Sequence, residues 1–171
     1  EHSYSDAQGS ANTLQAFANW KFNISDRLNL NTGLHFIQFY LNNNFSVEPR
    51  IGINWNFLKR HSLSAGFGIH SRLETLTNYF AESEDDYGFI SRPNKNIDFS
   101  KARHFVLGYQ NNSIQNLMIK SEIYYQDLYN VPVMKDSATP FSALNFSYGV
   151  TNEALVNSGS GENYGIELTV E

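Results

Sequence analysis

The chain has 171 residues, a formal net charge of −5 and no cysteine, and it is 41% hydrophobic, 15% aromatic and 17% charged. The lack of cysteine excludes disulfide frameworks, thiolate metal sites and cysteine nucleophiles, and a negative charge without a basic stripe argues against nucleic acid as a partner. The sequence also lacks the roughly 18 uninterrupted apolar residues that a membrane-spanning helix requires.

The first third of the chain alternates with period two, which is typical of β-strands with one apolar face. Every even position from Leu14 to Ile24 is apolar, and the alternation resumes over Leu28–Phe36 after a short turn. A second pair of strands is predicted over Val47–Phe57 and Leu63–Ile69, around the turn LKRH. Two alternating runs joined by a tight turn predict a β-hairpin in each case.

Three further strands are predicted in the second half, over Phe105–Tyr109, Leu117–Tyr125 and Tyr164–Val170. The glycines between Gly159 and Gly165 are predicted to lie in a turn before the last strand, because a phosphate-binding loop would need a helix after it.

Short and long connections alternate along this meander of about seven strands. Those after the first, third and fifth strands are short, those after the second, fourth and sixth are longer, and two of the latter run to roughly thirty residues. Outer-membrane barrels have this asymmetry, with short periplasmic turns and long extracellular loops. The predicted fold class is all-β: an antiparallel meander that forms part of a transmembrane β-barrel.

The distribution of aromatic and charged residues supports this prediction. Charged residues are almost confined to the polar faces, as expected if the other face contacts lipid. Aromatic residues collect near both strand ends, as two interfacial belts would. They are Trp20, Phe22, Trp55, Phe57 and Tyr109 near the short turns, and Phe36, Phe39, Tyr40, Tyr125, Tyr129 and Tyr164 near the long loops. A soluble β-sandwich also alternates, with its polar face outward, and stays open as an alternative.

Four stretches, FSVEPRIGINWNF, FSKARHFVLGYQNNS, IKSEIYYQDLYNVPV and LVNSGSGENYGIELTVE, resemble the C-terminal half of the barrel in TonB-dependent outer-membrane receptors of the type abundant in Bacteroidota. The likeness covers nearly the whole chain. It implies a parent barrel of about 22 strands, filled by a plug domain and energised through TonB, which binds a box ahead of the plug. It also implies that Pro49 and Arg50 begin a strand of the barrel. Residues 1–171 are expected to form a partial barrel domain that lacks the plug and the TonB box.

The function expected from this resemblance is that of a fragment of a receptor in the outer membrane of a Gram-negative bacterium. The parent would import a scarce nutrient such as an iron chelate, a cobalamin or an oligosaccharide. Its expected partners are outer-membrane lipid, the rest of the barrel and plug, TonB and the nutrient. Because part of a barrel leaves two open sheet edges, the isolated fragment is expected to self-associate. The alternatives are another outer-membrane channel or adhesin and a secreted β-sandwich binding module.

The stretch between Ser71 and Tyr109 holds the candidate ligand residues. Connections of this length are usually functional or disordered, and an acidic run flanked by aromatic residues suits a cation, a sugar or a macrocycle. The candidates are Tyr79, Phe80, Glu82, Glu84, Asp85, Asp86 and Tyr87. Their spacing does not match a calcium-binding EF-hand loop, and a solvated loop without ligand is the alternative.

No metal site, catalytic group or cofactor is expected. His35, His70 and His104 lie on the polar faces of three strands without the local spacing of metal ligands. Serine, histidine and acidic residues are plentiful, but nothing in the sequence brings three of them together, so the chain is not expected to be an enzyme.

Overall fold

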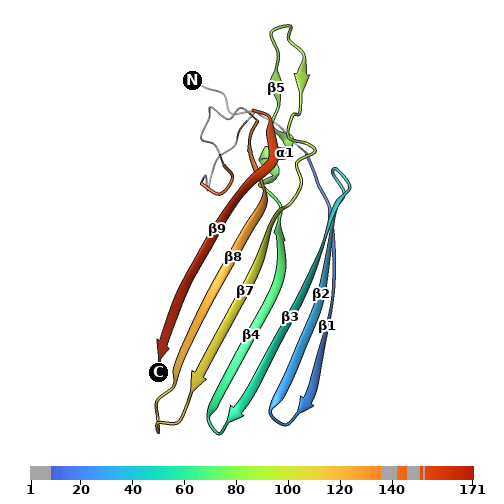
Figure 1. Ribbon diagram of the computed structural model, residues 1–171. Helices are drawn as coiled ribbons and strands as arrows, with labels where there is room; N and C mark the ends of the chain where they lie inside the picture. The colour runs from blue at the N-terminus through green and yellow to red at the C-terminus, as the bar shows by residue number, and fades with distance from the viewer. Residues whose placement is uncertain (1–8, 136–141, 146–150, 152) are drawn as a thin grey trace.

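The computed structural model describes residues 9–135, 142–145, 151 and 153–171. Seven long strands form one curved antiparallel sheet, in the order β1-β2-β3-β4-β7-β8-β9 (Figure 1). They are β1 Thr13–Ser25, β2 Leu28–Phe39, β3 Asn44–Leu58, β4 His61–Arg72, β7 Ser100–Asn111, β8 Ile119–Met134 and β9 Leu155–Val170. The described strands form one meander rather than two packed sheets, which disagrees with the sandwich alternative and confirms the all-β meander.

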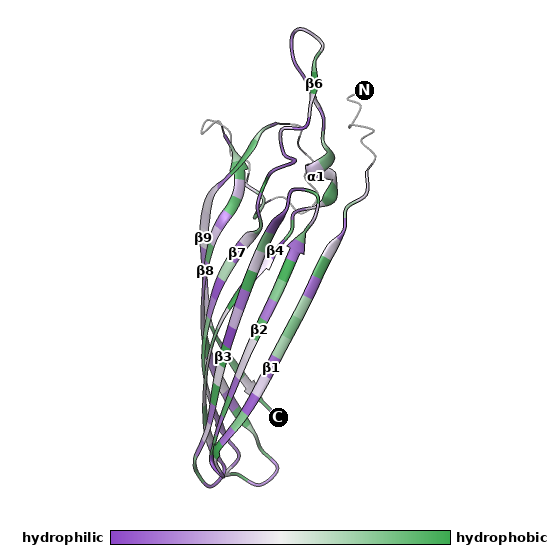
Figure 2. Cartoon of the chain, turned by 90° about the vertical axis from the view of Figure 1, so that its right-hand side faces the viewer, coloured by the Kyte–Doolittle hydropathy of each residue, from purple (hydrophilic) through white to green (hydrophobic). Residues whose placement is uncertain are grey.

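The register of the sheet separates an apolar face from a polar face. One row of directly paired residues crosses all seven strands and is apolar throughout: Phe22, Leu30, Ile53, Ala65, Leu107, Ile123 and Ile166. The next row points to the opposite face and holds only polar residues and a glycine: Asn23, Asn29, Asn54, Ser64, Gly108, Glu122 and Glu167. Hydrophobic and hydrophilic residues therefore alternate along the strands (Figure 2).

The apolar face is exposed. Side chains of its central row, such as Leu107, Ile123 and Ile166, are 54%, 53% and 74% exposed. Burying such residues in an apolar environment is favourable by roughly 1.5–3 kcal/mol each, so the face requires a cover that the described residues do not supply. Within the described residues, no helix is long and apolar enough to cross a membrane.

The connections differ at the two ends of the sheet. At the short-turn end they comprise residues 26–27, 59–60 and 112–118, and at the long-loop end residues 40–43, 73–99 and 135–154. The predicted alternation is confirmed for the last two pairs of connections. The first long connection was expected to be longer than it is, because β2 and β3 extend beyond their alternating runs to Phe39 and back to Asn44.

The core lies at the long-loop end, on the polar side of the sheet. Loop 73–99 packs there through the helix α1 (Leu76–Phe80), while its two small strands β5 (Ser83–Glu84) and β6 (Ile90–Ser91) form a projecting hairpin. The buried cluster consists of Ile37, Phe39, Tyr79, Ile97, Phe99 and Leu155. Phe39 was predicted to belong to an aromatic belt, but it is only 1% exposed. It points to the face that the loop covers.

Two local expectations are corrected by the structure. Gly159, Gly161 and Gly165 lie inside β9, not in a turn. A Cβ atom at Gly159 would come within 2.5 Å of a Val133 methyl group on β8. Glycine thus allows β8 and β9 to approach closely. Pro49 lies inside β3 rather than at its start, and the β3–β4 pairing begins directly after it, at Arg50.

Candidate functional site

Loop 73–99 is folded against the sheet rather than extended into solvent. Tyr79 is fully buried, and its ring meets that of Phe39 edge-on at a centroid distance of 5.0 Å. The two ends of the loop are joined, because Ser100 Oγ donates a hydrogen bond of 2.8 Å to the buried carboxylate of Glu74. A long connection with its own buried contacts is typical of a functional loop.

Asn94 connects this loop to the segment that precedes β9. Its side chain is fully buried. Its Nδ2 donates to the carbonyl oxygens of Thr151 and Glu153 at 3.3 and 2.9 Å, and its Oδ1 accepts from the Leu155 amide at 2.8 Å. One neutral amide thus pairs with three backbone groups, and those of Thr151 and Leu155 belong to buried residues that would otherwise lack this partner.

Further asparagines fasten the loop to the sheet. Asn42, in the connection between β2 and β3, donates to the carbonyl oxygens of Lys95 and Ile97 at 3.1 and 3.0 Å. Asn157 on β9 accepts a hydrogen bond of 2.8 Å from the Asp98 amide and donates one of 3.1 Å to the Asp98 carbonyl oxygen. The base of loop 73–99 is therefore held from several strands at once, and the loop can present its tip in a fixed position.

The tip is the β5–β6 hairpin, which we define as residues 82–92. Asp85 closes its turn by accepting hydrogen bonds of 2.9 Å from the amides of Tyr87 and Phe89. Gly88 adopts a φ of 82°, a conformation that costs glycine little. The hairpin stem is closed by an ion pair of 2.9 Å between Arg92 and Glu82. The turn is thus built by its own side chains.

The hairpin exposes aromatic and acidic side chains together. Tyr87, Phe89 and Ile90 are 87%, 72% and 66% exposed, and Glu84 and Asp86 are exposed beside them. A projecting group of apolar rings at the end of a fixed loop is unusual on a surface that contacts only water. Aromatic faces next to carboxylates can stack on a ring or attract a cation.

The seven candidate residues from the sequence divide into three groups. Glu84, Asp86 and Tyr87 are exposed on the hairpin, where a ligand can reach them. Glu82 and Asp85 are engaged in the ion pair and the turn. Tyr79 and Phe80 are buried and support the loop from below. Phe89 and Ile90 are exposed on the same hairpin but were not among the seven candidates, although their position just after the acidic run and Tyr87 in the sequence could have indicated both.

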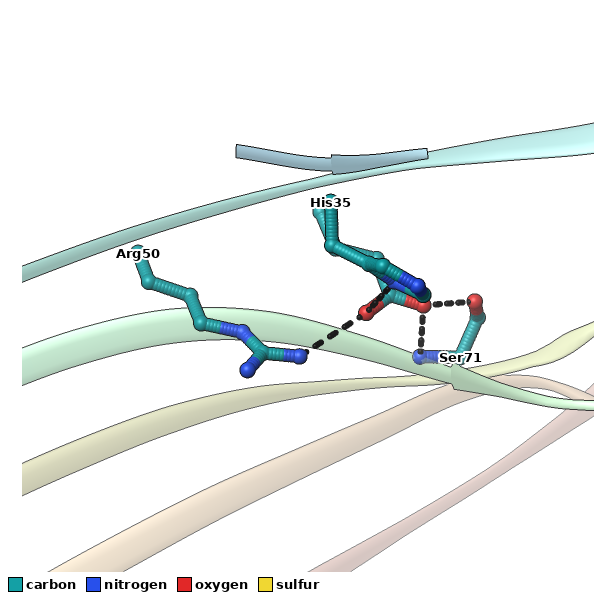
Figure 3. A network of polar contacts seen from close by, with 4 residues as sticks. His35, Arg50 and Ser71 are labelled. Carbon is teal, nitrogen blue, oxygen red and sulfur yellow. Dashed lines mark hydrogen bonds and ion pairs between the residues drawn. The ribbon is translucent and has the colours of Figure 1, made fainter. Parts of the chain in front are cut away.

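A buried carboxylate lies on the polar face where loop 73–99 leaves β4. Glu48 is 3% exposed. It contacts His35 Nδ1 at 3.0 Å and Arg50 Nη2 at 3.2 Å, and it accepts hydrogen bonds from the amide, at 3.0 Å, and the hydroxyl group of Ser71 (Figure 3). Three neighbouring strands meet at this one side chain. A paired and fully hydrogen-bonded carboxylate can be buried without a large penalty, so Glu48 fixes the position from which the loop starts.

The three histidines considered from the sequence are not equivalent. His35 belongs to the Glu48 network, whereas the rings of His70 and His104 lie next to each other with centroids 4.6 Å apart. His70 and His104 meet because β4 and β7 are neighbours in the sheet, although almost thirty residues separate these strands in the sequence. No group of three potential metal-binding side chains occurs among the described residues.

Comparison with known proteins identifies a family and solved structures with a similar fold. The family model for the β-barrel of TonB-dependent receptor-like proteins matches residues 2–171. Among solved structures, the siderophore receptor PirA from Pseudomonas aeruginosa matches with a TM-score of 0.69 and 13% identity, over 92% of this chain and 30% of the receptor. The ferric-catecholate import receptor Fiu from E. coli K12 matches with a TM-score of 0.64 and 12% identity, over 94% of this chain and 25% of the receptor. Comparison with curated proteins gives no match.

Proposed function

Because the chain belongs to the family of TonB-dependent receptor-like β-barrels, we propose that it forms part of the barrel of an outer-membrane receptor that imports a scarce nutrient. The observation that carries this proposal is the row of apolar residues that crosses all seven strands without interruption and lies exposed on one face. Lipid would cover that face, and the polar face would line the interior.

The rest of the parent protein would complete the structure. Its remaining strands would pair with the free edges of β1 and β9, since a barrel leaves no edge open. The chain spans about 30% and 25% of the lengths of PirA and Fiu, so a plug domain and the segment that contacts TonB are assigned to other parts of the parent.

Ligand capture is assigned to the β5–β6 hairpin. Glu84, Asp86 and Tyr87 would make the contacts, Glu82 and Asp85 would hold the turn, and Tyr79 and Phe80 would support it. The nutrient classes considered are an iron chelate, a cobalamin and an oligosaccharide. The first is supported by the two similar structures, one a siderophore receptor and the other a ferric-catecholate import receptor.

The test uses the full-length parent receptor in cells that lack their own copy. Uptake of a labelled ferric catecholate, a cobalamin and an oligosaccharide is measured with and without functional TonB. TonB-dependent uptake of one of them is expected, and the variant Glu84→Gln/Tyr87→Ala should weaken its binding by roughly tenfold or more, as loss of a central aromatic contact does.

The matched control is Tyr40→Ala/Glu153→Gln, which removes an exposed ring and an exposed carboxylate at the same end of the sheet but outside the hairpin. It should bind as the unmodified receptor does. Equal losses in both variants would contradict the role of the hairpin, while uptake that does not depend on TonB would contradict the receptor function itself.

A further inference from the structure

A cationic pocket lies at the short-turn end, opposite to loop 73–99. Its volume is about 580 Å³, within the range of small-molecule sites. Arg27, Lys59 and Arg60 line it together with the amide side chains of Asn54 and Gln110 and other neutral groups, and no carboxylate is among the lining residues. Among the described residues, every formal charge in the pocket lining is therefore positive.

The two arginines of this pocket differ from the other arginines of the chain. Elsewhere each guanidinium group has a carboxylate within 4.0 Å: Arg50 with Glu48, Arg72 with Glu74, Arg92 with Glu82 and Arg103 with Asp127. Within the described part of the chain, Arg27 and Arg60 have no such partner. Asp26 is next to Arg27 in the same turn but does not line the pocket. The positive charges of Arg27 and Arg60 are thus not paired with a carboxylate of the described residues.

The backbone holds the cationic residues in place. The carbonyl oxygen of Arg27 accepts a hydrogen bond of 2.7 Å from the Asn56 amide, and that of Arg60 accepts one of 2.8 Å from the Asn112 amide. Arg60 has a φ of 67°, which a non-glycine residue adopts only when its surroundings require it. Its Nη1 donates to the Ser113 carbonyl oxygen at 3.3 Å. Three short connections and the strands β3, β4 and β7 therefore contribute residues to the lining of one cavity.

We propose that this pocket binds a phosphate group. Guanidinium and ammonium groups surrounded by amide donors match the charge and the several acceptor oxygens of phosphate, which arginine can bind through two parallel hydrogen bonds. Two sources of phosphate reach this place. A soluble phosphorylated molecule can enter from the polar face, on which Asn54 and Gln110 lie. A phospholipid headgroup can approach from the short-turn end of the sheet, where Trp55, between the lining residues Asn54 and Asn56, lies on the apolar face as tryptophan does at a membrane interface. The proposal is independent of which nutrient the receptor imports.

The test uses the full-length receptor in a nonionic detergent, and Arg27→Gln/Arg60→Gln is the variant. Calorimetric titration of the receptor with inorganic phosphate and with glycerol phosphate measures its affinity for soluble phosphates. Binding of a lipid headgroup is measured as the difference in the thermal unfolding midpoint between nanodiscs of phosphatidylglycerol and nanodiscs of phosphatidylcholine. The control, Lys95→Gln/Lys101→Gln, removes two positive charges that do not line the pocket.

Binding of at least one probe by the unmodified receptor and the control is expected, with a loss of about tenfold or more in the arginine variant. If calorimetry shows this loss, the source is a soluble phosphate. If only the phosphatidylglycerol-dependent rise in unfolding midpoint is lost, the source is the lipid headgroup. The proposal would be overturned if the arginine variant and the control gave the same affinities and the same unfolding midpoints, with circular dichroism showing that both are folded.

Discussion

Tyr79 shows how a single side chain decides whether loop 73–99 is docked. It is fully buried against Phe39, and within the described residues its hydroxyl group has no hydrogen-bond partner. Burial raises the pKa of Tyr79, because a phenolate is poorly solvated there. The neutral ring stabilises the docked loop, whereas the ionised ring would oppose docking.

The stability of the docked loop should therefore fall in alkali. The pKa of Tyr79 is higher in the folded state than its ordinary value of 10.0, so its contribution is fully present below pH 10.0 and decreases as the pH rises above that value. The protection of residues 73–99 against hydrogen exchange, measured relative to the intrinsic base-catalysed rate in the full-length receptor, should fall above this pH. Tyr79→Phe should remove that dependence, while Tyr87→Phe on the exposed hairpin should keep it. An unchanged alkaline profile in Tyr79→Phe would contradict this role.

The strands were predictable from the sequence, whereas the docking of the loop was not. Alternation identified all seven strands because the middle of each has one apolar and one polar face. It faded toward the long-loop end, where residues such as Ser100 and Ala102 are buried although they face opposite to the apolar row. The burial of Tyr79 and the adjacency of His70 and His104 depend on contacts between segments far apart in sequence, which periodicity does not report.

The asparagine contacts explain why a chain with few charges is rich in amides. An asparagine side chain offers a donor and an acceptor without the desolvation penalty of a charge, so it can pair with irregular backbone in a buried place. Asn94 does this between loop 73–99 and the segment before β9. This contact joins two connections of the long-loop end into one unit.

Asn94→Ala should separate these two connections. It would leave the Thr151 carbonyl and the Leu155 amide without this partner, at a cost of about 1–3 kcal/mol for a buried unsatisfied group. Hydrogen exchange should accelerate both in residues 73–99 and at the start of β9. The neighbouring Asn96 is exposed, and Asn96→Ala should leave exchange unchanged. Acceleration confined to one of the two segments would show that they are not coupled through Asn94.

At the scale of the molecule, the sheet has an exposed apolar face and, among the described residues, two edges without a partner strand, β1 and β9. Neither is stable in water, since free strand edges and large apolar patches both promote association. In a full barrel the same features would contact lipid and the adjoining strands. The isolated chain therefore lacks the surroundings for which its faces are suited.

The isolated fragment should consequently form oligomers in plain buffer that detergent disperses. Size-exclusion chromatography with light scattering, with and without detergent, measures this. Ile123→Lys places a charge on the apolar face and should weaken the association, whereas Glu122→Lys on the polar face should not. A monodisperse monomer of the unmodified fragment in plain buffer would contradict the expectation.

Under the proposed role of the β5–β6 hairpin in ligand capture, the anchoring of loop 73–99 limits how the receptor can change its ligand. The loop depends on Phe39, Asn42 and Asn157, which belong to other parts of the chain. A related barrel that received the loop alone would lack these three contact residues. The loop would therefore have to be transferred together with them to keep its position. The β5–β6 hairpin, by contrast, is closed by its own residues Glu82, Asp85 and Arg92. If the hairpin binds the ligand as proposed, new ligand preferences are expected to evolve first by exchange of this hairpin, while the base beneath it is inherited unchanged.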